Sequence, residues 1–180
     1  VLLLGVLSLL TGQDFLSMAI DTGGGVPVEQ PSAPSPADDA TVDLVSFVLD
    51  DAQDTWQNLL GPRYERARLV LFTDATESGC GFAQSATGPF YCPADRRVYI
   101  DLGFYRELDA RFGAPGDFAQ AYFLAHEIGH HVQTVLGTEA EVRRAQQSSP
   151  QMANQLSVAM ELQADCYAGV WAKATSQPQL

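Results

Sequence analysis

The sequence predicts an α+β fold with a small β-sheet for this chain of 180 residues. Apolar side chains recur at helical spacing over residues 42–60, 116–137 and 149–173. Runs with the composition of strands lie between the first and the second of these segments. Helices and strands that follow one another in blocks, rather than alternating, are typical of the α+β class.

The predicted strands begin after the first helix, which ends at Gly61 and Pro62. The segment "ARLVLFTD", which ends at Asp74, is one compact strand-like run. "GPFYC" and "RVYIDL" flank "PADR" and predict a hairpin. About three strands are therefore expected in the sheet.

Capping signals delimit the C-terminal helices. "FYRELDARFG" predicts a short helix, and the long helix follows it. Asp117 is the expected N-cap of the long helix, and Gly137 marks its end. Ser149 and Pro150 stand at the start of the last predicted helix, which runs to about residue 173.

The N-terminal residues begin with the apolar run "VLLLGVLSLL". A helix that spans a bilayer needs roughly 20 apolar residues, so we interpret residues 1–20 as a truncated membrane anchor or a signal segment, with a buried core helix as the alternative. Residues 21–40 are rich in Gly, Pro, Ser and Asp and predict a disordered linker. Residues 41–180 are expected to form the folded domain, truncated at its C-terminus.

The chain carries 22 acidic side chains against 10 Lys and Arg, a formal net charge of −12. Such a surface repels phosphate backbones, so nucleic acid is not expected as a partner. Apolar residues make up 46% of the chain, which is enough for the core of one domain.

All three histidines lie within "HEIGHH", residues 126–131. Successive residues of a helix are rotated by about 100°, so His126 and His130 lie on one face and both reach one metal ion. Glu127 stands beside that face, in the position of a general base, whereas His131 points away from the cluster. This is the H-E-x-x-H arrangement of zinc hydrolases.

The chemistry accounts for each residue of this motif. Two neutral imidazoles hold Zn²⁺ and leave a coordination position for water, whose pKa the metal lowers to about 7. Glu127 accepts the proton and passes it to the leaving amine. The alternative is a helix with surface histidines and no metal. The run "AYFLA" before His126 argues against it, because it predicts a buried helix in which polar side chains need partners. We therefore expect one Zn²⁺ per chain.

A catalytic zinc site needs a third ligand, which is expected in "MELQADCYAGVWA". Glu161 and Asp165 stand four residues apart and share a helix face, so one can bind the metal while the other orients a ligand histidine. Glu161 is the preferred ligand because its side chain reaches further. The alternative is a solvated acidic face, but the neighbouring residues are mostly apolar, and unpaired carboxylates would be costly there.

Cys80 and Cys92 flank the Gly-rich segment "GFAQSATGPFY". A disulfide between them would close a short loop outside the cytoplasm. The alternatives are free buried thiols and a zinc site, for which the spacing is wide. Cys166 lies among apolar residues on the last predicted helix and is expected to be a small core residue.

Three segments resemble the bacterial neutral zinc metallopeptidase family: "SGCGFAQSATGPFYCPADRRVYIDLGFYREL", "RFGAPGDFAQAYFLAHEIGHHVQTVLG" and "ELQADCYAGVWA". The resemblance covers residues 60–173 and implies a zincin-like domain, similar to gluzincin-type peptidases, with an HExxH active-site helix. By the family pattern His126 and His130 would be ligands, Glu127 catalytic and Glu161 the third ligand. The family's N-terminal membrane segment implies a single-pass protein of the bacterial cell membrane, with its catalytic domain outside the cytoplasm.

These features predict a zinc metalloendopeptidase that acts on a peptide or protein substrate. Two alternatives stay open: a catalytically inactive zinc-binding ectodomain that acts as an interaction module, and a regulatory ectodomain with a structural metal. Glu127 argues against the first, because an inactive site needs no base. The second would require a closed site with four ligands, and the sequence offers three.

Overall fold

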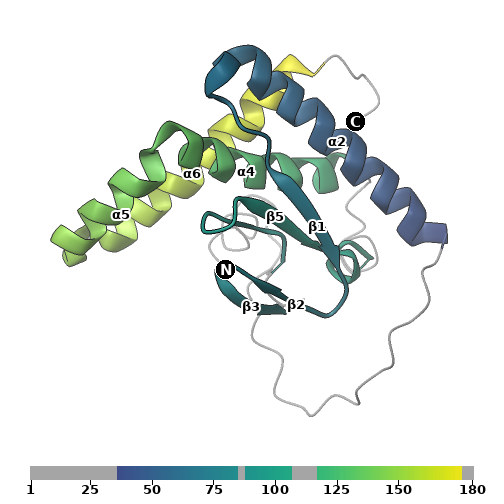
Figure 1. The fold of residues 1–180 in the computed structure, drawn as a ribbon, viewed down its shortest axis with the longest axis horizontal. Helices are drawn as coiled ribbons and strands as arrows, with labels where there is room; N and C mark the ends of the chain where they lie inside the picture. Colours follow the sequence, from purple (N-terminus) through teal and green to yellow (C-terminus); the bar gives the residue numbers. More distant parts are fainter. Residues whose placement is uncertain (1–35, 85–87, 107–116, 176–180) are drawn as a thin grey trace, which may run out of the picture.

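The structure is a computed structural model that describes residues 36–84, 88–106 and 117–175. It has the predicted α+β architecture, in which long helices pack beside a small sheet (Figure 1). The helices are α2 (Pro36–Leu60), α4 (Asp117–Leu136), α5 (Thr138–Ser148) and α6 (Ala153–Ala174). The strands are β1 (Arg68–Phe72), β2 (Ala75–Ser78), β3 (Gly81–Gln84), β4 (Phe90–Cys92) and β5 (Arg97–Asp101). Short 3-10 turns, Gly61–Arg63 and Pro150–Met152, follow α2 and precede α6.

The main sheet has the strand order β1-β5-β4. β4 and β5 form the predicted antiparallel hairpin, with Tyr91 opposite Val98. β1 corresponds to the run "ARLVLFTD" and pairs parallel to β5, with Val70 opposite Tyr99. β2 and β3 form a separate hairpin that the sequence patterns do not predict. Its strands have four residues each and are mostly exposed, so they lack an apolar pattern.

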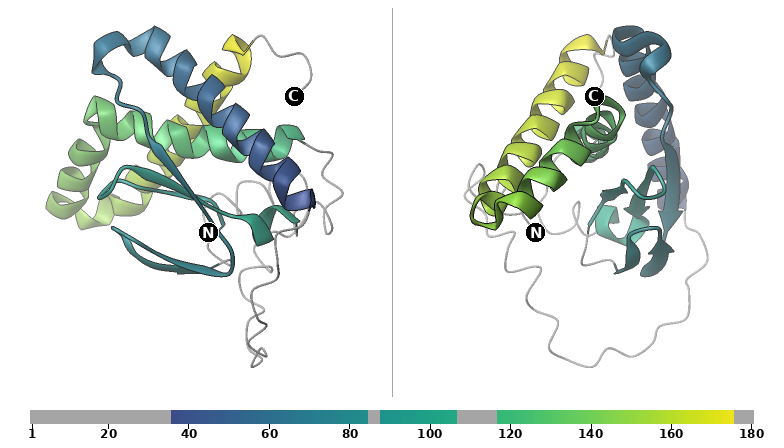
Figure 2. Two further views of the ribbon diagram at one scale, coloured as in Figure 1. Left: turned by 45° about the vertical axis from the view of Figure 1, so that its right-hand side comes forward. Right: turned by 60° about the vertical axis from the view of Figure 1, so that its left-hand side comes forward.

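Helix α4 lies at the centre of the fold, between α6 on one side and α2 with the sheet on the other (Figures 1 and 2). The apolar run at its N-terminal half is buried as predicted, including Phe123, Leu124 and Ala125. The surrounding core includes Val45, Val48, Trp56, Val98, Ile100 and Trp171. Because α4 is packed on both sides, the polar residues that it carries have fixed positions.

Some helix boundaries differ from the predicted ones. α2 begins at Pro36, so residues 36–40 of the predicted linker are helical. Gly137 ends α4 as predicted, with a left-handed φ of 81°, and α5 follows it directly. α5 has no buried residue and few apolar side chains, so the sequence gives no apolar period strong enough to predict it. Residues 102–106 are helical and overlap the predicted short helix, whose remaining residues lie outside the described ones.

The predicted single-pass membrane location is contradicted. Within the part of the chain that the structure describes, no helix is both long enough and apolar enough to cross a bilayer. Residues 1–20, from which an anchor is expected, and residues 21–35 of the expected linker lie outside the described residues.

The cysteines agree with the prediction in part. Cys80 and Cys92 form the predicted disulfide, which joins the turn between β2 and β3 to β4. Cys166, by contrast, is free and exposed on α6 rather than buried in the core. Leu162 and Val170 on the same helix are exposed as well. α6 buries only the face that meets α4 and α2, so its apolar composition does not mean that the whole helix is buried.

Candidate metal centre

The site forms where α4 and α6 approach each other closely. Gly129, the fourth residue of "HEIGH", faces Ala164 of "ELQAD". A Cβ atom at Gly129 would lie 2.8 Å from the carbonyl oxygen of Ala164 and 3.0 Å from its Cα. Only a residue without a side chain fits this contact. The close approach brings the histidines of α4 next to the carboxylates of α6.

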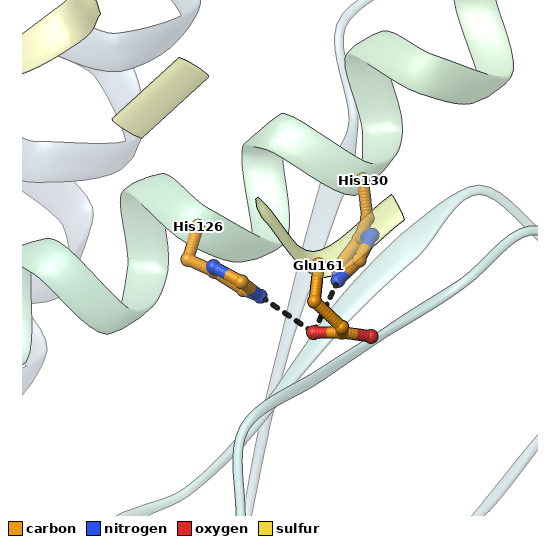
Figure 3. A group of neighbouring side chains, drawn as sticks. All are labelled: His126, His130 and Glu161. Carbon is orange, nitrogen blue, oxygen red and sulfur yellow. Dashed lines mark ion pairs between the residues drawn. The ribbon is translucent and has the colours of Figure 1, made fainter. Parts of the chain in front are cut away.

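His126, His130 and Glu161 converge on one point (Figure 3). Nε2 of His126 lies 3.3 Å from Oε2 of Glu161, and Nε2 of His130 lies 3.6 Å from the same oxygen. One potential ligand atom of each residue lies within 4.8 Å of the others. The structure therefore brings the predicted histidine pair together with the predicted third ligand.

Asp165 orients the ring of His126. Its Oδ1 lies 2.8 Å from Nδ1 of His126 and accepts its proton, so the ring is turned with Nε2 toward Glu161. The hydroxyl of Tyr122 donates to the same Oδ1 at 2.6 Å. Tyr122 is not among the predicted site residues. It lies one turn before His126, and this spacing is the signal that could have identified it.

Gln133 orients the ring of His130. Its amide nitrogen donates to the carbonyl oxygen of Met160 at 2.7 Å and to Oε1 of Gln163 at 3.0 Å. The amide oxygen of Gln133 consequently faces His130 and lies 2.9 Å from its Nδ1. The proton is again on Nδ1, which leaves Nε2 as a potential ligand atom. Gln133 is fully buried and is likewise not predicted, although it follows His130 by three residues.

The three side chains are electrostatically coupled. Burial opposes a positive charge on His130, but hydrogen bonding to Glu161 and the nearby carboxylate of Glu127 raise the pKa of His130 to about 9. Burial likewise opposes charge on His126, and the hydrogen bond to Glu161 nevertheless raises its pKa. Burial also disfavours the charged form of Glu161, yet both imidazoles hold its pKa well below the usual range. The cluster therefore stabilises a carboxylate in contact with positive charge.

Glu127 is buried beside this cluster, with 4% of its surface exposed. Burial raises the pKa of Glu127, against the lowering effects of His130, His126 and a hydrogen bond from the backbone N–H of Tyr91. Tyr91 belongs to β4, so Glu127 lies between the histidines and the sheet. A carboxyl group with a raised pKa is suited to accept and return a proton near neutral pH.

His131 does not join the cluster, in agreement with the helical rotation. Its Nε2 donates to the carbonyl oxygen of Glu65, which can only accept. Its Nδ1 lies 3.1 Å from the hydroxyl of Tyr91 and accepts from it. Burial lowers the pKa of His131, so the ring is neutral at neutral pH. This residue ties α4 to β4 and to the segment before β1.

The three converging side chains fit a zinc ion. Two imidazole nitrogens and one carboxylate oxygen form the ligand set of a catalytic zinc site with three protein ligands. Both rings are held through Nδ1, as zinc-binding histidines are, so each Nε2 is directed at the cluster and can bind the metal once it has lost its proton. Of the residues described, no other group of three or more His, Cys, Asp or Glu converges in this way.

One protein-family model matches residues 1–180, and its description is "Putative neutral zinc metallopeptidase". The chain is 48% identical over 160 residues to "Uncharacterized protein YpfJ" of Escherichia coli (strain K12), covering 85% of this chain and 56% of that protein. It is 49% identical over 118 residues to "Uncharacterized protein Mb2605" of Mycobacterium bovis, covering 65% of this chain and 39% of that protein. The chain thus spans about half the length of these curated relatives, and no solved structure matches it. The match over its whole length shows that the chain belongs to the putative neutral zinc metallopeptidase family.

Proposed function

We propose that the protein is a zinc metalloendopeptidase that hydrolyses peptide bonds in a peptide or protein substrate. The observation that carries this proposal is the convergence of His126, His130 and Glu161 beside the buried carboxyl group of Glu127. Membership of a zinc metallopeptidase family supports the metal and the class of reaction. In this proposal the three converging residues bind one Zn²⁺ per chain, and Glu127 is the general base.

When bound, zinc supplies a Lewis acid that polarises the substrate carbonyl and lowers the pKa of water to about 7. Glu127 accepts the proton of the attacking water and transfers it to the leaving amine. Burial raises the pKa of Glu127, which favours the first of these steps, proton uptake, closer to neutral pH. Asp165 and Gln133 hold the rings of His126 and His130 through Nδ1 and keep each Nε2 in place.

The proposal accounts for two features that a structural metal site leaves unexplained. Structural zinc sites are closed by four protein ligands, whereas three of the described residues converge here. A non-catalytic site also has no use for Glu127, whose burial without a function would only cost free energy. An open site with a buried base is what hydrolysis requires.

The substitution Glu127→Gln tests the proposal. We expect the variant to bind zinc as the wild type does and to lose at least about 100-fold in kcat/KM, because general acid–base catalysis contributes roughly 10²–10⁴-fold. Zinc per chain is measured by mass spectrometry, and hydrolysis with a peptide library of random sequence. Glu141→Gln is the matched control, since Glu141 is exposed on α5. Unchanged turnover in Glu127→Gln contradicts the mechanism, and a zinc-loaded wild type that cleaves no peptide contradicts the function.

A further inference from the structure

A cavity of about 520 Å³ opens beside the metal centre. His130 and Glu161 line it on one side, and its other walls come from α5 and α6, which lie side by side (Figure 2). Ligand pockets in proteins typically have volumes of about 300–1,000 Å³. The cavity is therefore large enough for a substrate side chain next to a peptide bond held at the metal centre.

The wall of this cavity combines apolar surface with a fixed polar frame. Val142 and Met160 line it and are partly buried. The amide nitrogen of Gln146 donates to the carbonyl oxygen of Ala153 at 3.2 Å and to the hydroxyl of Ser157 at 3.0 Å. These hydrogen bonds tie α5 to α6, so the wall has a defined shape before any ligand binds.

The charged side chains on the wall outside the metal centre are paired with each other. Glu139 and Arg143 stand one turn apart on α5. Nε of Arg143 donates to Oε1 of Glu139 at 2.9 Å, and Nη2 of Arg143 donates to the same oxygen. Their charges cancel, although the chain as a whole carries −12. A charged substrate side chain against this wall would meet no unpaired opposite charge, so the wall gives it no advantage over an uncharged one.

We propose that this cavity receives an uncharged side chain of the substrate, at a residue flanking the cleaved peptide bond, and that the Glu139–Arg143 ion pair sets this specificity. The inference rests on the proposed peptidase function and names the substrate class of the same site. Side chains such as Leu, Met and Gln meet Val142 and Met160 without leaving a charge unpaired. Glu139 and Arg143 select the substrate and take no part in the chemical step.

Two substitutions test the proposal in opposite directions, with peptides that carry Leu, Glu or Lys at the residues flanking the cleaved bond. Glu139→Gln leaves a positive charge on the wall, so peptides with Glu should gain about two- to fivefold in kcat/KM relative to those with Leu, as expected for an exposed charge pair. Arg143→Gln leaves a negative charge, so peptides with Lys should gain by a similar factor. Glu141→Gln and Arg144→Gln are matched controls and should keep the wild-type preference, since both residues are exposed on α5 outside the cavity lining.

A binding measurement separates this inference from the proposed function. In a Glu127→Gln background, fluorescence anisotropy with the labelled peptides reports selection without turnover. Opposite changes in affinity for the two substitutions support the inference, even if the wild type hydrolyses none of the peptides. The inference is overturned if both substitutions leave the preference unchanged, if the wild type prefers Glu or Lys to Leu at every flanking residue, or if no peptide binds. If the two variants still hydrolyse peptides but keep the wild-type preference, this inference is overturned and the proposed peptidase function stands.

Discussion

The two histidines of the metal centre are held by partners of different charge. Asp165 binds His126 through a carboxylate, whereas Gln133 binds His130 through a neutral amide. A carboxylate partner raises the basicity of a metal-binding histidine more strongly than an amide does. Removing Asp165 should therefore weaken zinc binding without removing a ligand.

Substitutions at Glu161 and Asp165 should give distinct phenotypes. Glu161→Ala removes the proposed oxygen ligand, so we expect the purified variant to be nearly zinc-free. Asp165→Ala should still bind zinc, but with an affinity lower by roughly 10- to 100-fold and with slower turnover. Zinc per chain and chelator competition measure the two effects. Gln155→Ala, at an exposed residue of α6, is the control. An exchange of the two phenotypes would identify Asp165 as the ligand.

Helical rotation is sufficient to place His126 and His130 together and to direct His131 elsewhere. The role of Glu161 as the third ligand is predicted from its spacing to Asp165 and from the family resemblance. Tyr122 and Gln133 stand at equally regular spacings but are not predicted. Spacing identifies which residues share a face, whereas the rotamer and the partner helix decide which side chain turns toward a ring.

At the scale of the elements, the approach of α4 to α6 depends on Gly129. A Cβ there would lie 2.8 Å from a backbone oxygen of α6, which cannot move away as a flexible side chain could. Gly129→Ala should therefore push the helices apart and reduce the free energy of unfolding by about 1–3 kcal/mol. Zinc affinity should fall as well, because Glu161 and Asp165 move with α6. Urea denaturation and zinc titration measure the two effects.

Gly169→Ala provides the matched control for this prediction. Gly169 lies on α6, and no atom lies within 4 Å of the position that a Cβ would occupy there, so alanine fits without a clash. Alanine also favours the helix, and the variant should gain up to about 1 kcal/mol in stability. If Gly129→Ala were as stable as Gly169→Ala and bound zinc as the wild type does, close packing at Gly129 would have no part in forming the site.

Helices and strands that have a strong local pattern of apolar residues are predicted well from the sequence. Elements that depend on contacts between distant segments are not. The apolar period of α4 and the strand composition of β4 and β5 identify these elements from short stretches of sequence. The parallel pairing of β1 with β5 depends on contacts between distant segments, which no local pattern specifies. α5 has no buried residue and few apolar side chains, so no apolar run marks it in the sequence, although it forms a wall of the cavity.

For the whole molecule, the charges of the site should make stability depend on pH. The pKa of His130 is about 9 in the folded protein, above its ordinary value of 6.5. The stabilisation from its contact with Glu161 is therefore fully present below pH 6.5 and is lost as the pH rises through about 9. In the presence of a chelator, the Tm difference between the wild type and Glu161→Gln should shrink by about 2 °C or more between pH 6 and pH 10.

The stabilisation of the folded protein by added zinc should depend on pH in the opposite direction. His126 and His130 must lose a proton before they bind the metal, so the increase in Tm on adding zinc should grow between pH 6 and pH 9. Differential scanning fluorimetry with and without zinc measures both trends. A zinc effect that declines over this range would show that these histidines are not the ligands.

The origin of Glu161 on a separate helix has a consequence for biosynthesis. Glu161 lies 31 residues after His130, so the ribosome releases both histidines before the proposed third ligand. At about 5–20 residues per second, this interval lasts roughly 2–6 s. During that time the nascent chain has the H-E-x-x-H sequence but an incomplete ligand set. If the proposed function holds, the capacity to cut peptide bonds would arise only after α6 has emerged and packed against α4.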